Sequence, residues 1–174
     1  SGSLEREQVL DPTRTLQALN AAFQMSRHDG MYFTIWYGVY DRRTRELAWA
    51  GGGHPPAFLL RGGELRSLDS TTFMVGAMDD YDAPTLRTTL APGDRLYLFS
   101  DGVFELHLRD GGIWGLDRLE AFVRAAPADG VLDAVVRETT RVMLEGRGAD
   151  ATDIPAATGV TWDDDFSLIE LRFN

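Results

Sequence analysis

Residues 31–68 read MYFTIWYGVYDRRTRELAWAGGGHPPAFLLRGGELRSL and predict two successive β-hairpins. Residues 31–40 are dense in aromatic and β-branched side chains, which favour a pleated and largely buried surface. We therefore expect a central strand there, with its aromatic side chains in the core. The polar break at 41–46 lets residues 47–50 return antiparallel as the second arm of the first hairpin.

The second hairpin turns at Gly62 and Gly63, because glycine tolerates the positive φ angles that tight turns require. Its arms are residues 58–60 and 65–68. Later apolar runs that begin or end at turn residues also predict strands, at 86–90, 95–99 and 166–173. The strand-forming segments therefore predict antiparallel pairing throughout.

Three segments predict helices. Asp11 and Pro12 have the form of an N-cap and a first-turn proline, and apolar side chains then recur at helical spacing, which predicts a helix over 12–25. The same spacing recurs from 116 to 123 and from 132 to 143. Because strands and helices are grouped rather than strictly alternating, the pattern indicates a layered α+β domain.

Composition narrows the class of protein. The chain has 174 residues, which suits one domain, and no apolar run reaches the roughly 20 residues that cross a bilayer. No signal-peptide-like leader is present at the start, so the cytoplasm is expected. The absence of cysteine excludes disulfides, thiolate zinc sites and cysteine nucleophiles. A formal charge of -10 argues against nucleic acid or an anionic membrane as a partner.

Polar residues interrupt the hydrophobic pattern next to strands at three places, residues 51–56 (GGGHPP), 100–105 (SDGVFE) and 162–167 (WDDDFS). Carboxylates at strand ends repel one another unless a cation lies between them, and Mg²⁺ or Mn²⁺ prefers such oxygen ligands. Asp101 and Asp164 are thus a candidate metal site, the alternative being local backbone bonding or solvent exposure. His54 is predicted to be structural, with its ring bonded to backbone.

These segments, in this order, resemble the type 2C metal-dependent protein serine/threonine phosphatases. The bacterial branch typified by the stage II sporulation protein E and by sigma-factor-regulating phosphatases is the most similar. The motifs that carry the resemblance are WYGVYD at 36–41, GHPP at 53–56, PGD at 92–94, SDGVFE at 100–105 and DDFSL at 164–168. The resemblance covers about residues 11–174.

The resemblance implies an antiparallel β-sandwich flanked by helices, in α/β/β/α layers, with two divalent cations, Mg²⁺ or Mn²⁺, per intact domain. It implies that these metals activate a water that attacks phosphorus, with no catalytic side chain beyond that water. Asp101 and Asp164 match the two later metal-binding aspartates of the family. Asp165, Gly102 and Glu105 are expected to support them, although Glu105 could equally bond only local backbone.

One family motif has no counterpart in this sequence. The family carries a further metal-bridging aspartate in an Asp-x-Ser-Gly-His-Gly-like motif ahead of the first predicted helix, and nothing before residue 11 resembles it. We therefore expect residues 11–174 to form a phosphatase domain without its first strands, preceded by a leftover or linker segment at 1–10. With only part of the ligand set, this chain alone is expected to bind metal weakly and to have little activity.

The leading functional hypothesis is a bacterial signal-transduction hydrolase that removes phosphate from phosphoserine or phosphothreonine on a cytoplasmic regulatory protein. By resemblance, the substrate would be a protein such as an anti-sigma-factor antagonist, and the full-length protein would carry an N-terminal sensor or receiver domain. Two alternatives stay open. One is a non-catalytic binding or signal-transmitting module on a degenerate phosphatase fold, and the other is a hydrolase of small phosphate esters.

Overall fold

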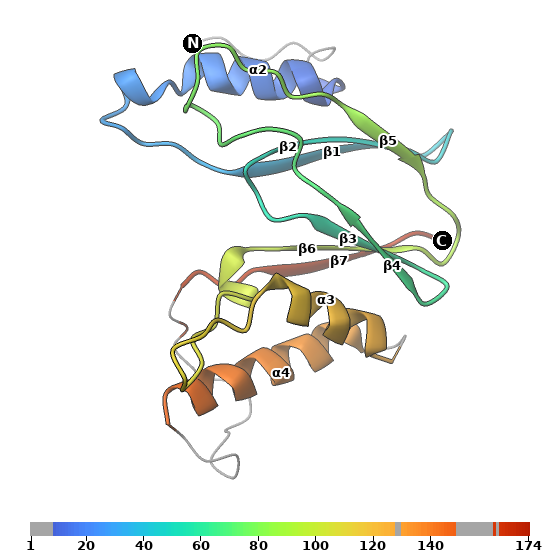
Figure 1. Ribbon diagram of the computed structural model, residues 1–174. Helices are drawn as coiled ribbons and strands as arrows, with labels where there is room; N and C mark the ends of the chain where they lie inside the picture. The colour runs from blue at the N-terminus through green and yellow to red at the C-terminus, as the bar shows by residue number, and fades with distance from the viewer. Residues whose placement is uncertain (1–8, 128–129, 149–161, 163) are drawn as a thin grey trace. The chain divides into compact units, whose positions relative to one another are not determined.

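The computed structural model describes residues 9–127, 130–148, 162 and 164–174. The chain forms two compact units, each with its own antiparallel sheet and its own helices (Figure 1). The first unit comprises Ser1–Ala57, Leu68–Pro92 and Phe173–Asn174, and the second comprises Phe58–Ser67 and Gly93–Arg172. The grouping of antiparallel strands and helices confirms the α+β class expected from the sequence.

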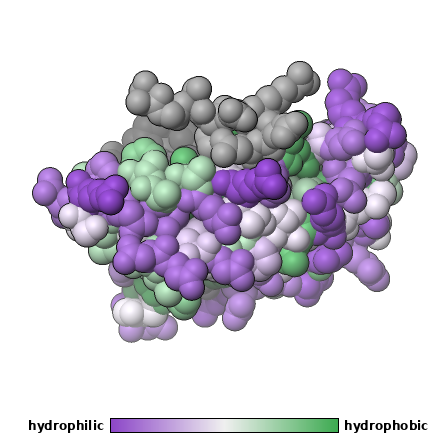
Figure 2. Space-filling view, turned by 90° about the horizontal axis from the view of Figure 1, so that it is seen from above, coloured by the Kyte–Doolittle hydropathy of each residue, from purple (hydrophilic) through white to green (hydrophobic). Residues whose placement is uncertain are grey.

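The first unit contains a three-stranded sheet in the order β1-β2-β5, with both pairs antiparallel. Its strands are β1 (Ile35–Asp41), β2 (Glu46–Gly52) and β5 (Leu86–Thr89). Helix α2 (Pro12–Ala22) packs on β1 and β2, and Leu16 of the helix is fully buried with Ala50 of β2. Seen from above, the visible surface is mostly hydrophilic, with hydrophobic residues exposed at several places (Figure 2).

The start of α2 follows the sequence prediction, but its end does not. The side chain of Asp11 accepts a hydrogen bond from the Arg14 N–H at 3.3 Å, as expected for an N-cap. The helix ends at Ala22 instead of residue 25, and a short 3₁₀ turn, η1 (Met25–Arg27), follows. The N–H of Met25 donates to the carbonyl of Gly76, so a distant segment takes the bond that would have continued the helix.

The prediction of a central strand at residues 31–40 is wrong for the part of the sheet that the structure describes. β1 begins at Ile35 and lies at an edge, because β2 is its one described neighbour. Tyr32, expected in the core, is 54% exposed. Side-chain type indicated a strand correctly, but burial depends on which segments cover it, and the sequence pattern does not contain that information.

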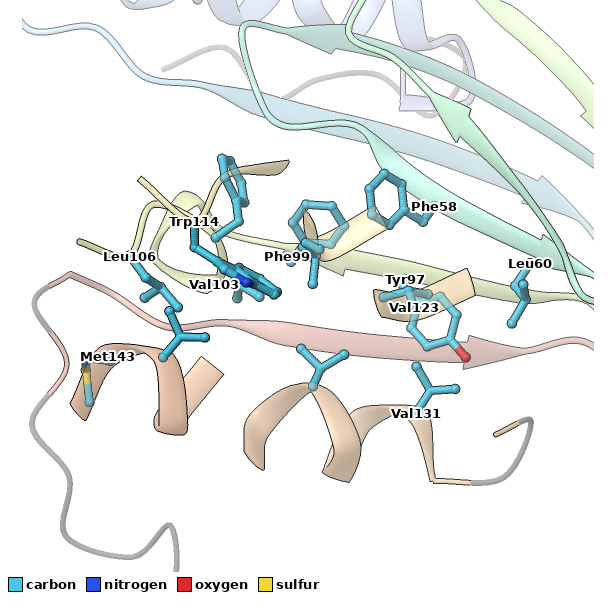
Figure 3. Packing of buried hydrophobic residues seen from close by; sticks show 14 residues of the cluster. Phe58, Leu60, Tyr97, Phe99, Val103, Leu106, Trp114, Val123, Val131 and Met143 are labelled. Carbon is cyan, nitrogen blue, oxygen red and sulfur yellow. The ribbon is translucent and has the colours of Figure 1, made fainter. Parts of the chain in front are cut away.

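The second unit contains a four-stranded sheet in the order β4-β3-β6-β7. Its strands are β3 (Ala57–Arg61), β4 (Glu64–Leu68), β6 (Arg95–Phe99) and β7 (Leu168–Arg172). Helices α3 (Leu116–Ala125) and α4 (Val131–Gly146) lie along one face of this sheet (Figure 1). Tyr97 and Phe99 of β6 belong to one buried cluster with Val123 of α3 and Val131 of α4, and Tyr97 points toward Val131 (Figure 3).

Both helices of the second unit match the predicted amphipathic segments. Residues 145–161 are rich in Gly, Ala, Asp and Thr and lack apolar periodicity, so the sequence predicts a mobile loop there. α4 continues to Gly146, so this loop begins later than predicted. Most of that loop, and with it the prediction that it is mobile, lies outside the described residues. None of the helices that the structure describes is long and apolar enough to cross a membrane.

The Pro-Gly-Asp turn before β6 is held by an ion pair inside the second unit. Asp94 is 1% exposed, and its two carboxylate oxygens accept hydrogen bonds from Arg61 Nε at 2.9 Å and Nη2 at 2.6 Å. The paired guanidinium and carboxylate form the bidentate geometry that makes such contacts strong. The turn is thereby fixed to β3, which sets where β6 begins.

Candidate metal centre

The two candidate metal-binding aspartates flank neighbouring strands of the second unit. Asp101 lies two residues after the end of β6 and opens the 3₁₀ turn η2 (Asp101–Val103), while Asp164 lies shortly before β7. β6 and β7 pair antiparallel, with Phe99 opposite Leu168. The C-terminal end of β6 therefore lies beside the N-terminal end of β7.

Ser100 joins the two segments through both its backbone and its side chain. Its N–H donates to the carbonyl of Ser167 at 3.0 Å, which continues the β6–β7 ladder by one bond. Its Oγ donates to the carbonyl of Asp165 at 2.6 Å and accepts from the Ser167 N–H at 2.9 Å. No role for Ser100 is predicted from the sequence, although a hydroxyl between a predicted strand and a candidate ligand is a signal that the sequence contains.

Gly102 allows the segments to approach closely. A Cβ atom at this position would lie 2.6 Å from the carbonyl oxygen of Asp165 and 3.4 Å from the carbonyl carbon of Asp164. The 2.6 Å contact is shorter than Cβ atoms show in proteins, so a side chain at residue 102 would force the two segments apart. The glycine of the Ser-Asp-Gly motif is explained by this approach, because its backbone does not adopt a positive φ angle.

Both aspartates are exposed, and each is oriented by the amide that follows it. Asp101 Oδ1 accepts a hydrogen bond from the Gly102 N–H at 3.0 Å, and Asp164 Oδ1 accepts one from the Asp165 N–H at 2.8 Å. Within the described part of the chain, neither carboxylate forms an ion pair with an arginine or histidine. Each aspartate therefore retains ligand capacity that no described cation of the protein takes up.

A hollow of about 520 Å³ lies beside the second aspartate and is lined by Trp162, Asp164, Asp165 and Phe166. The rings of Trp162 and Phe166 stack with their centres 4.1 Å apart, and both pack against the core of the second unit. The aromatic pair thus anchors the segment at each end of the acidic residues. The exposed carboxylates of Asp164 and Asp165 remain on the surface of this anchored turn.

The donor set fits a hard cation such as Mg²⁺ or Mn²⁺, because both aspartates supply carboxylate oxygen and the protein has no competing thiolate. The set is small. Across residues 9–127, 130–148, 162 and 164–174, no group of three or more His, Cys, Asp or Glu side chains is placed to hold a metal ion. Asp101 and Asp164 could thus supply part of a coordination sphere. We predict that their carboxylates lie within about 6 Å of each other, the span that one hard cation can bridge.

Two other residues from the sequence analysis are placed by local bonds. The N–H of Glu105 donates to the carbonyl of Asp101 at 2.8 Å, which holds Glu105 in the turn after the aspartate, with its side chain exposed. In the first unit, the ring Nδ1 of His54 lies 2.9 Å from the carbonyl oxygen of Pro55. The expected bond between the His54 ring and backbone is therefore present.

A family model described as Stage II sporulation protein E (SpoIIE) matches residues 4–174. The chain is 28% identical over 107 residues to the phosphoserine phosphatase RsbU of Bacillus subtilis, an alignment that covers 60% of the chain and 32% of RsbU. It is 22% identical over 137 residues to the stage II sporulation protein E of the same organism, covering 78% of the chain and 16% of that protein. The chain thus spans less than a third of either curated relative.

Among solved structures, the SiaA-PP2C domain of Pseudomonas aeruginosa matches with a TM-score of 0.70 and 22% identity. The match covers 95% of the chain and 62% of the SiaA-PP2C chain. A more distant match, RsbX, has been solved in complex with magnesium, with a TM-score of 0.52 and 10% identity. These likenesses confirm the expected fold, with two antiparallel sheets and helices as in PP2C phosphatase domains.

Proposed function

The chain belongs to the stage II sporulation protein E family, and from this premise we propose that it is a metal-dependent phosphatase in which Asp101 and Asp164 hold a divalent cation. The observation that carries the proposal is the meeting of the two aspartate segments, where Ser100 Oγ binds the backbone on both sides of Phe166. Exposed carboxylates beside a hollow are open to a phosphorylated ligand and its cation.

When bound, a divalent cation lowers the pKa of water and offsets negative charge on a phosphoryl group. The residues of the chain itself would hold the cation, keep space for it and orient water. Asp101 and Asp164 present carboxylate oxygens that the neighbouring amides already hold in place. Asp165 is proposed to support them from the adjacent position, and Gly102 keeps the space between the segments free of a side chain. Glu105, exposed in the same turn, is proposed to orient water at the site.

We assign the substrate to phosphoserine or phosphothreonine on a regulatory protein, because the relative RsbU is named a phosphoserine phosphatase. An anti-sigma-factor antagonist in the bacterial cytoplasm is the proposed kind of partner. An upstream sensor or receiver domain is proposed to control the activity, since the curated relatives are much longer than the matched region. Mg²⁺ or Mn²⁺ is proposed as the cofactor, with two ions in a complete domain.

The test is hydrolysis of a phosphoserine peptide in Mn²⁺ by the 174-residue chain and by any longer product that the gene encodes. Asp101→Asn and Asp164→Asn are each expected to reduce kcat/KM at least about 100-fold in the active form, because each removes an anionic ligand. The matched control is Asp110→Asn. Asp110 is also exposed, and its Oδ1 also accepts an amide hydrogen bond, from Gly112, but it lies outside the site.

Unchanged activity in both site variants would refute the assignment of these two aspartates. Hydrolysis of nucleotides or sugar phosphates without hydrolysis of phosphopeptides would instead indicate a small-ester hydrolase.

A second candidate function is a binding module without chemistry. It is favoured by the absence, within the described residues, of a third acidic or histidine side chain grouped with Asp101 and Asp164. Such a module would bind the phosphorylated partner in EDTA as well as in Mn²⁺, and Asp101→Asn would not weaken that binding. A phosphatase would show the opposite dependence on metal.

A further inference from the structure

We propose that Ser100 is a positioning residue of the metal centre, whose hydroxyl sets the placement of the Asp164 turn relative to Asp101. The inference rests on the proposed function. A single Oγ acts as donor to the Asp165 carbonyl and as acceptor for the Ser167 N–H. Ser100 itself directly precedes Asp101, so one residue connects the backbone around both candidate ligands.

The strand ladder alone does not explain these side-chain bonds. Backbone pairing between β6 and β7 ends with Phe99 opposite Leu168, and the Ser100 N–H extends it to the Ser167 carbonyl. The hydroxyl reaches further, to Asp165, which adjoins a candidate ligand and lies beyond the last ladder pair. Its contribution therefore concerns the turn that carries Asp164 and not the sheet.

Because the side-chain bonds of Ser100 are exposed to solvent, removing its hydroxyl should change the position of the Asp164 turn more than the stability of the fold. The carbonyl of Asp165 and the N–H of Ser167 belong to exposed residues, so water can replace the serine hydroxyl if it is removed. The fold then loses little, since a typical hydrogen bond contributes only about 1 kcal/mol net. Water does not, however, hold the turn at a defined distance from Asp101.

Gly102 and Ser100 act together on this distance. Gly102, which follows Asp101, lets the carbonyl of Asp165 come into contact with the η2 turn. Ser100, which precedes Asp101, donates a hydrogen bond from its Oγ to the same carbonyl. Glycine permits the approach, whereas the hydroxyl enforces it. Loss of the hydroxyl should therefore leave the two carboxylates present but variably spaced, which weakens a shared cation because ligand geometry sets affinity.

The experiment compares Ser100→Ala, Ser100→Thr and Thr140→Val in the 174-residue chain. The probe is Tb³⁺, a hard cation that takes oxygen ligands and is detected by luminescence sensitised from Trp162 in the adjacent hollow, with displacement by Mn²⁺ as the second reading. Ser100→Ala is expected to weaken Tb³⁺ binding by about tenfold or more, the range found for groups that orient metal ligands. Ser100→Thr, which keeps the hydroxyl, should restore affinity to within about threefold.

Thr140→Val is the matched control, since it removes the Oγ1 hydrogen bond to the Val136 carbonyl in α4, remote from the aspartates. It should leave Tb³⁺ binding unchanged. Two outcomes would overturn the positioning role, provided that Asp101→Asn still abolishes Tb³⁺ binding. One is an unchanged Tb³⁺ affinity in Ser100→Ala, and the other is an equal loss of affinity in Thr140→Val. If the unsubstituted chain bound neither Tb³⁺ nor Mn²⁺, the metal centre itself would be wrong, and the role of Ser100 with it.

Discussion

Gly102 is the residue at which the geometry of the candidate site is least tolerant of change. Gly102→Ala would place a methyl group 2.6 Å from the Asp165 carbonyl oxygen, and the turn would have to move away. We expect a stability loss of about 1–3 kcal/mol, as for overpacked sites, together with weaker cation binding. Thermal unfolding in EDTA and Tb³⁺ titration measure the two effects separately.

Gly112→Ala is the matched control for this change. Gly112 has no positive φ angle, and its added Cβ would meet side-chain atoms of Asp110 at 3.1 Å and of Leu108 at 3.7 Å, but no backbone atom within 3.7 Å. It should change Tb³⁺ binding little. If Gly102→Ala bound Tb³⁺ as well as the unsubstituted chain, the close approach of the two segments would have no bearing on the site.

Asp94 has a structural role that can be measured by itself. Its carboxylate is buried, whereas the partner Arg61 side chain is 50% exposed and can return to water when the pair is broken. Asp94→Asn should therefore cost about 1–3 kcal/mol of unfolding free energy, mostly from buried hydrogen bonds rather than from Coulomb attraction. Denaturant unfolding is the measurement.

The comparison for Asp94 is Glu120→Gln, which breaks the exposed i,i+4 pair with Arg124 in α3. That pair should contribute no more than about 0.5 kcal/mol. Equal losses in the two variants would show that burial of Asp94 does not strengthen its interaction with Arg61.

At the level of secondary structure, the β6–β7 pair carries the candidate site, and a cross-strand contact marks its register. Tyr97 lies directly opposite Glu170, and the Tyr97 hydroxyl donates to Glu170 Oε1 at 2.9 Å. Arg172 Nε donates to the other oxygen of Glu170 at 2.9 Å. A register shift of one residue would bring Tyr97 opposite a different side chain and separate Ser100 from the Asp164 turn.

This contact predicts a pH dependence of stability. Burial, and secondarily the Glu170 carboxylate, raises the pKa of Tyr97 from its ordinary value of 10.0 to about 12. Because the folded state holds the phenol proton more tightly, the stabilisation is complete below pH 10 and is lost as the pH rises toward 12. Unfolding free energies measured across this range should fall more steeply for the unsubstituted chain than for Tyr97→Phe. If the unfolding free energy fell equally steeply with pH in both proteins, the pH dependence would not come from Tyr97.

Taken over its full length, the chain carries two of the carboxylates that its family resemblance associates with the metals. Cation affinity grows with the number of anionic ligands, so the 174-residue chain should bind Mn²⁺ weakly, at one site at most, and turn over little phosphopeptide. Asp101→Asn or Asp164→Asn should abolish that binding, as followed by the electron paramagnetic resonance signal of free Mn²⁺. Tight binding of two ions would mean that another residue supplies the missing ligand.

The sequence by itself determined the kinds of element, their order and the family. Turns and helix caps depend on neighbouring residues. Gly62 with Gly63 therefore predicted a hairpin and Asp11 with Pro12 predicted a helix start, and both are present. The motif around Asp101 could likewise be found by inspection, because a ligand at a strand end needs only the strand and its neighbour. Local interactions suffice for such features.

Only the tertiary structure decided which distant segments meet. The edge position of β1 and the exposure of Tyr32 depend on which other segments pack against the strand, and the residues of the strand do not show which segments these are. The same holds for the bond from Ser100 to Asp165, which joins residues 65 positions apart. Strand pairing brings such residues together after the chain has closed large loops, so neither residue signals its partner in the sequence.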